Sequence, residues 1–132
     1  MFEGPITGVT FDSNTIVGVL HEGANVYTSG NSIRNNISYD SDGSGGDAAW
    51  CAPAGNTVSG NDRYNPSGKY GTYCSSYPET RLDPLFVYVP TGGFAGYANG
   101  DYHLKPNTPV PTLGAYPLNG ELLRGVFLES TY

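Results

Sequence analysis

Long hydrophobic runs are missing from this chain of 132 residues. No apolar stretch approaches the roughly eighteen residues that a membrane-spanning helix needs, and no basic segment followed by an apolar one marks a signal peptide. The sequence therefore predicts no membrane span. It leaves open whether Met1 is the natural start of the protein or follows the loss of an upstream segment.

Helix-forming segments and positive charge are also scarce. Gly (19 residues) and Pro (10 residues), together with Asn and Ser, interrupt almost every stretch in which an amphipathic helix would form, which predicts an all-β domain. Only six Lys and Arg residues face twelve Asp and Glu, so the net charge is −6. A surface of this sign repels phosphate backbones, so the sequence predicts no nucleic-acid partner.

One short pattern occurs twice in the first half of the chain. The segment Gly30–Asn36 (GNSIRNN) aligns with Gly55–Asn61 (GNTVSGN), which places Val58 at the position equivalent to Ile33. Phe11 begins a fainter copy upstream, at a similar interval before Ile33. Repeats of roughly 20–50 residues between short apolar segments are typical of a solenoid, in which each copy stacks on the next. We therefore expect Phe11, Ile33 and Val58 to lie one above another inside a coil of parallel strands.

The same alignment places other residues in the coil. Asn14, Asn36 and Asn61 are expected at one equivalent corner, because Asn tolerates the left-handed backbone and its amide can satisfy turn groups. Aligning the two copies backward pairs Val26 with Cys51. The polar residues 40–47 read as a loop that leaves the coil.

The two cysteines, Cys51 and Cys74, are separated by about the length of one more coil. Neighbouring parallel strands lie about 4.8 Å apart, and this distance suits the Cα separation of a disulfide, roughly 4.4–6.8 Å. A bridge between neighbouring coils would imply an oxidising compartment. The alternative is a pair of buried thiols in the core, and the spacing leaves both readings open.

The last third of the chain changes character. Residues 83–90 and 101–106 read as two strands separated by a Gly-rich loop, and Leu118–Tyr132 as a final apolar strand that would cover an open end of the coil. We therefore expect one domain in two parts, the parallel β-helix coils over residues 1–82 and the last coil with a C-terminal capping segment over residues 83–132.

These last segments resemble a known ending. Asp83-Pro84-Leu85-Phe86-Val87, then Gly100 to Pro109 (GDYHLKPNTP) and Leu113-Gly114-Ala115-Tyr116 resemble the C-terminal end of right-handed parallel β-helix proteins of the pectin-lyase-like superfamily. The match departs from that pattern at Val110-Pro111-Thr112. The resemblance implies a short right-handed parallel β-helix related to polysaccharide lyases, glycoside hydrolases, or phage and surface proteins. Such a resemblance supports a fold more strongly than it supports a particular reaction.

Two groups of residues are candidates for binding. Asp40, Asp42 and Asp47 lie among glycines, in the kind of flexible loop that supplies oxygen ligands to Ca²⁺, although the terminal Glu of an EF-hand is missing. A solvated loop without metal is the competing interpretation, and no other cofactor is indicated.

The second group is aromatic. Flat rings with a polar edge suit sugar stacking, and an arginine can hold a uronate carboxylate, so a substrate-binding surface is predicted. Its residues are Trp50, Tyr64, Tyr70, Tyr73 and Arg63. The competing interpretation is that these rings cover a small core.

No motif identifies a catalytic base, and paired carboxylates such as Asp12 and Asp62 are the remaining catalytic candidates. We therefore expect a secreted or cell-surface module that contacts carbohydrate, or caps a polysaccharide-acting protein, without being catalytic itself. Its partner would be a polysaccharide. One alternative is a self-assembling β-helix of a fibre, surface layer or phage appendage, whose partners are copies of itself in a homo-oligomer. The other is an active polysaccharide lyase or glycoside hydrolase.

Overall fold

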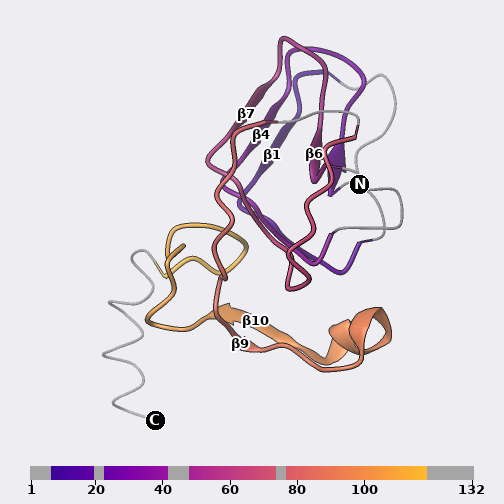
Figure 1. The fold of residues 1–132 in the computed structure, drawn as a ribbon. Coiled ribbons are helices and arrows are strands. Elements are labelled where there is room, and N and C mark those ends of the chain that lie inside the picture. The colour runs from indigo at the N-terminus through magenta and orange to yellow at the C-terminus, as the bar shows by residue number, and fades with distance from the viewer. Residues whose placement is uncertain (1–6, 20–22, 42–47, 74–76, 119–132) are drawn as a thin grey trace.

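The computed structural model describes residues 7–19, 23–41, 48–73 and 77–118. They form a coil of short parallel strands and a C-terminal segment that begins with a hairpin (Figure 1). The strands of the coil, in chain order, are β1 (Thr10–Asp12), β2 (Thr15–Val17), β3 (Ala24–Asn25), β4 (Ser32–Arg34), β5 (Ile37–Tyr39), β6 (Trp50–Cys51), β7 (Thr57–Ser59) and β8 (Asp62–Tyr64).

The strands stack turn upon turn into three parallel sheets, β1-β4-β7, β2-β5-β8 and β3-β6. In the first sheet Phe11 pairs with Ile33, and Ile33 pairs with Val58, as the repeat predicts. Figure 1 shows the three strands that carry these residues, β1, β4 and β7, side by side. The predicted fold class, an all-β protein with a short parallel β-helix, is confirmed.

Each three-residue strand of the first sheet ends because the next residue has a left-handed backbone. Between the first and second sheets this position is occupied by Ser13, Asn35 and Gly60, with φ of 57°, 57° and 66° in successive turns. Gly, Asn and, less readily, Ser adopt this conformation. The chain therefore bends at the same point of every turn, and the strands stay in register.

An asparagine ladder joins the turns at this corner. Asn36 Oδ1 accepts a hydrogen bond from the backbone N–H of Asn14 (2.8 Å), and Asn61 Oδ1 accepts one from the backbone N–H of Asn36 (3.0 Å). The Asn36 amide also donates to the carbonyl of Phe11 (3.0 Å). The predicted corner of Asn14, Asn36 and Asn61 is confirmed, and the amides satisfy backbone groups that the bend leaves without a sheet partner.

A second ladder, not among the predicted features, runs at the corner before β4 and β7. Asn31 Oδ1 accepts from the backbone N–H of Val9 (3.0 Å), and Asn56 Oδ1 accepts from the backbone N–H of Asn31 (2.8 Å). Two bends of a turn are thus fixed by the turn that follows.

The predicted pairing of Val26 with Cys51 is wrong by one residue. Asn25 pairs with Cys51, and Ala24 pairs with Trp50. The connection from β3 to β4 is one residue longer than the connection from β6 to β7. An alignment counted backward from β4 and β7 therefore loses the register when it crosses these connections.

Two apolar clusters lie on opposite sides of the β2-β5-β8 sheet. The first fills the interior of the coil and consists of Ala24, Val26, Ile33, Ala49, Trp50, Ala52 and Val58, with Phe11, Ile16 and Tyr77 against it. The second joins the outer face of that sheet to the C-terminal segment and consists of Ile37, Phe86, Leu104 and Val110 with surrounding partly buried side chains. Neighbouring residues of β5, Ile37 and Ser38, face the two sides because side chains alternate along a strand.

The C-terminal segment begins with an antiparallel hairpin of β9 (Phe86–Tyr88) and β10 (Asp101–Leu104), connected through the 3-10 helix η1 (Gly93–Asn99). An aromatic cluster holds it against the coil, with the Tyr39 ring 5.5 Å from Phe86 and 6.4 Å from Tyr97 between centroids. Tyr97 also donates a hydrogen bond to Asp40 (2.5 Å).

No helix among the residues that the structure describes is long and apolar enough to cross a membrane.

The segment then crosses the corner of the coil at Gly114. Its N–H donates to the Asn35 carbonyl (2.9 Å), and a Cβ at this position would lie 2.6 Å from Thr15 Oγ1 and 2.8 Å from Ile37 Cδ1. The contact therefore requires glycine. The predicted terminal cover of residues 118–132 lies outside the described residues apart from Leu118.

Removing one rung of the first ladder tests how much the corner depends on it. Asn36→Ala leaves the backbone N–H of Asn14 and the carbonyl of Phe11 without their buried partner, so we expect the free energy of unfolding to fall by about 3 kcal/mol. Urea unfolding measures it. The control Asn107→Ala, at an exposed turn, should change it by less than about 0.5 kcal/mol. Equal effects would contradict a structural role of the ladder.

A pair of glycines tests the packing of the C-terminal segment. Gly114 and Gly68 have nearly the same φ, 77° and 73°, but a Cβ at Gly68 would meet nothing within 4 Å. Gly68→Ala should cost only backbone strain, about 1 kcal/mol. Gly114→Ala adds the clash with Thr15 and Ile37 and should cost about 3 kcal/mol. Equal costs in thermal or urea unfolding would show that the segment does not pack on the coil.

Candidate functional site

A groove crosses three successive turns of the coil beside β3 and β6. Its volume is about 400 Å³. Among the described residues it is lined by Asn25, Val26, Tyr27, Cys51, Ala52, Pro53 and Tyr73. Three consecutive residues from one turn, three from the next and Tyr73 from the third supply this lining, so the groove runs along the direction in which the turns stack.

Two tyrosine side chains of the groove are strongly exposed. Tyr27 is 61% exposed and Tyr73 is 72% exposed. Tyr27 lies just after β3, and its hydroxyl accepts a long hydrogen bond from the Asn25 amide (3.4 Å). A large exposed ring of this kind offers an apolar face and a polar edge to a partner.

The wall of the groove is held from inside the coil. The hydroxyl of Tyr77 lies 2.7 Å from the carbonyl oxygen of Ala52 and 3.1 Å from that of Pro53, to which it donates. This contact fixes the backbone of residues 52–53 against the following turn. Tyr77 thereby positions part of the groove without entering it.

Cys51, at the floor of the groove, is disulfide-bonded. The other cysteine of the chain, Cys74, lies outside the described residues, so its pairing with Cys51 stays a prediction.

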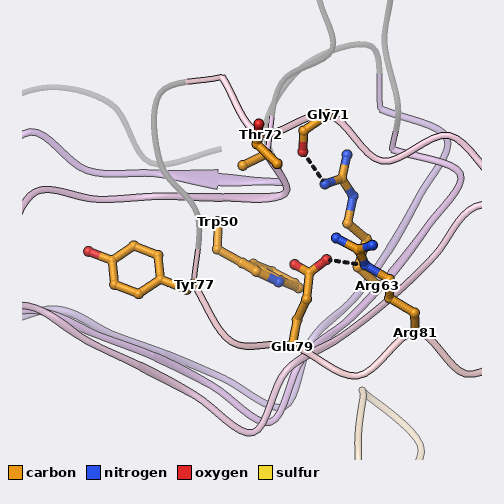
Figure 2. A pocket seen from close by; sticks show the side chains of 8 residues that line it. Trp50, Arg63, Gly71, Thr72, Tyr77, Glu79 and Arg81 are labelled. Atoms are coloured by element: carbon orange, nitrogen blue, oxygen red, sulfur yellow. Dashed lines mark hydrogen bonds and ion pairs between the residues drawn. The ribbon is translucent and has the colours of Figure 1, made fainter.

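A second, polar cluster lies inside the last turn of the coil (Figure 2). Arg63 is 1% exposed and donates through Nη1 to the Gly71 carbonyl (2.7 Å). Glu79 is ion-paired with Arg81, with 3.3 Å between Oε2 and Nε. Trp50, also 1% exposed, lies beside Glu79 in Figure 2. The cavity between these side chains measures only about 10 Å³, which is room for one water molecule.

Burial raises the pKa of Glu79, and the charge of Arg63 and the hydrogen bond from Arg81 partly counteract this. The cluster therefore sets the Glu79 carboxylate, whose side chain is 9% exposed, between the buried guanidinium of Arg63 and the half-exposed guanidinium of Arg81. The cavity is too small to admit a sugar.

Comparison with known proteins adds no relative. Neither the family models, nor the curated proteins, nor the solved structures gave a match to the chain.

The structure separates the five residues predicted to bind substrate. Only Tyr73 lines the groove. Trp50 and Arg63 are each 1% exposed inside the coil and do not line the groove. The Tyr64 ring lies tilted against that of Tyr39 on the outer face of the β2-β5-β8 sheet, with 5.8 Å between centroids, and the Tyr70 ring lies under the guanidinium of Arg81 at 4.1 Å.

Several residues of these sites are not among the predicted ones. Tyr27 could have been predicted from the sequence. Ala24 and Val26, two residues apart, face the interior of the coil, and the alternation of side chains along an extended chain then places the Tyr27 side chain on the outer face. Glu79 and Arg81 gave no such signal, since isolated charges after a turn-rich stretch read as surface residues.

Of the predicted calcium ligands, Asp40 accepts the hydrogen bond from Tyr97, while Asp42 and Asp47 lie outside the described residues. Within the described ranges no three acidic, His or Cys side chains gather in a way that would hold a metal ion. The calcium site stays a prediction.

The two carboxylates considered for catalysis differ in setting. Asp12 is bound by Arg34 (2.8 Å) and Asn35 (3.0 Å) at the surface of the coil. Asp62 is fully buried, and its Oδ1 accepts from the Thr80 hydroxyl (2.6 Å) and the Leu82 N–H (2.9 Å). A carboxyl group without exposed surface cannot act on a polymer, so Asp62 is structural.

Burial raises the pKa of Asp62 to about 6, and the nearby charges of Glu79 and Asp83 act in the same direction. The hydrogen bonds from Thr80 and Leu82 oppose the shift. Its second oxygen, Oδ2, has no hydrogen-bond partner among the described residues, which is consistent with a costly negative charge at this position.

Asp62 leads to a pH-dependent prediction. Because its folded-state pKa lies above the ordinary value, its contribution to the free energy of unfolding is greatest at low pH and falls as the pH rises from about 4 to about 6. Asp62→Asn removes the ionisation and keeps an acceptor for Thr80. We expect the free energy of unfolding of the variant, relative to the wild type, to rise by about 2 kcal/mol across this range.

Urea unfolding at a series of pH values measures this difference. Asp12→Asn is the control, because hydrogen bonds from Ser13, Arg34 and Asn35 lower the pKa of Asp12, and its effect should be constant above about pH 4.5. Parallel pH profiles for the wild type and Asp62→Asn would contradict the assignment.

Proposed function

We propose that this chain is a carbohydrate-contacting β-helix module whose binding surface is the groove between Tyr27 and Tyr73. The observation that supports it best is the pair of exposed tyrosine rings beside a groove of about 400 Å³. Stacking of sugar rings on such faces buries apolar surface, and the hydroxyls and backbone groups at the edge provide hydrogen bonds.

The course of the groove also suits a polymer. Neighbouring turns of a parallel coil lie about 4.8 Å apart, so a groove that crosses three turns offers an extended, repetitive surface to a short length of chain. The coil is rigid at this place, because Tyr77 fixes one wall and Cys51 is covalently bonded. A preformed site loses little conformational entropy on binding.

The wider setting follows from the resemblance at the C-terminus and from the disulfide. A relation to the pectin-lyase-like superfamily and an oxidising compartment both favour a secreted or cell-surface module of a polysaccharide-acting protein. We assign it a binding or capping role, since Asp62 is buried and Asp12 is engaged with Arg34. This assignment rests on fold-level likeness and on the groove.

Aromatic substitutions test the proposal. Tyr27→Ala and Tyr73→Ala remove the two rings, and each should weaken binding of a polysaccharide ligand by about tenfold or more. Affinity gel electrophoresis with soluble polysaccharides detects the change. Tyr88→Ala is the matched control, because Tyr88 is 55% exposed on β9 and does not line the groove, and its affinity should equal that of the wild type.

Absence of binding across a broad panel, or an equal loss in all three variants, would contradict a role of the groove. The same samples test self-association, the alternative suggested by the exposed Leu82, Val87 and Tyr88. Light scattering that gives the mass of one chain at high concentration would remove that alternative. A mass of several chains would favour it.

A further inference from the structure

The groove is polar in part but carries no charge among its described lining residues. Its polar groups are the two tyrosine hydroxyls, backbone atoms and the Asn25 amide, which is mostly buried and donates to Tyr27. Its apolar lining consists of the tyrosine rings and the exposed Pro53, above the buried Val26 and Ala52. Neutral hydrogen-bonding groups can match sugar hydroxyls, which both donate and accept. They supply no counter-charge for a carboxylate or sulfate.

The positive charges of the chain are placed elsewhere. Arg34 is paired with Asp12, Arg63 is buried inside the coil, and Arg81 is paired with Glu79 and lies over Tyr70. Lys69 and Lys105 are exposed but do not line the groove, and Arg124 is outside the described residues. No guanidinium or ammonium group of the described chain is therefore available to an acidic sugar in the groove.

The shorter segments whose structure is not described add little positive charge. Residues 1–6, 20–22, 42–47 and 74–76 contain no Lys or Arg, and their only basic side chain is His21. An unperturbed histidine is largely neutral at pH 7. The carboxylates in these segments are Glu3, Glu22, Asp42 and Asp47. The net charge of −6 also repels anionic polymers at longer range.

From this distribution of charge we propose that the groove binds uncharged glycans and discriminates against uronates and sulfated sugars. The proposal rests on the carbohydrate-binding function proposed above and specifies its substrate class. A sugar acid that stacked on Tyr27 or Tyr73 would lose part of the hydration of its charge without gaining a cationic partner. A neutral sugar of the same ring shape carries no charge and does not incur this cost.

A matched pair of polymers tests the charge directly. Polygalacturonate and its fully methyl-esterified form share one backbone and differ in the carboxylate. They are run in affinity gels beside two neutral polymers, galactomannan and xyloglucan, and two acidic ones, alginate and chondroitin sulfate. The proteins are the wild type, Tyr27→Ala, Tyr73→Ala and the control Tyr88→Ala.

We expect at least one uncharged polymer to bind in a tyrosine-dependent manner, with every acidic polymer weaker by about tenfold or more. Binding of the uncharged polymer should be unaffected by salt, because no ion pair contributes to it. Binding of an acidic polymer at equal or higher affinity, lost in Tyr27→Ala and Tyr73→Ala, would overturn the inference and leave the carbohydrate-binding function standing. Absence of tyrosine-dependent binding to any polymer would overturn both.

Discussion

The structure depends on one constraint, which is that backbone groups buried at the bends of the coil need hydrogen-bond partners. Sheet hydrogen bonds satisfy the strands, but the strands of the coil are short, so much of each turn is bend. The amides of Asn36 and Asn61 meet this need by bonding to the turn before. Because each amide bridges two turns, it fixes the bend and the spacing between turns at once.

Two surfaces of the coil follow from this regularity. One side of the coil is covered by the C-terminal segment, which packs Phe86 and Val110 on the outer face of the second sheet. The side beside β3 and β6 carries the groove. Polar groups are tolerated inside the last turn because Arg63 and Glu79 have hydrogen-bond or charge partners there, and this cluster ends the apolar interior without a further apolar layer.

The sequence predicted the parts of the fold that depend on the repeat. The stacking of Phe11, Ile33 and Val58 and the asparagine corner follow from residue type and interval, which local physics determines. The register of Cys51 was missed by one residue because equivalent connections in successive turns need not have equal length. The site was predicted poorly: an aromatic residue looks the same in sequence whether it is buried, as Trp50 is, or exposed, as Tyr73 is. Only the position of its neighbours in three dimensions separates the two cases.

The two asparagine ladders have a consequence for the gain or loss of repeat units. Every rung makes the same bonds to the rung before it, at sequence separations of 22 and then 25 residues, so the ladder tolerates segments of unequal size between rungs. Duplicating or deleting one complete unit would leave each remaining amide with an equivalent neighbour. The architecture is therefore open to growth and shortening by whole units, and a surface that crosses several units would lengthen or shorten with them.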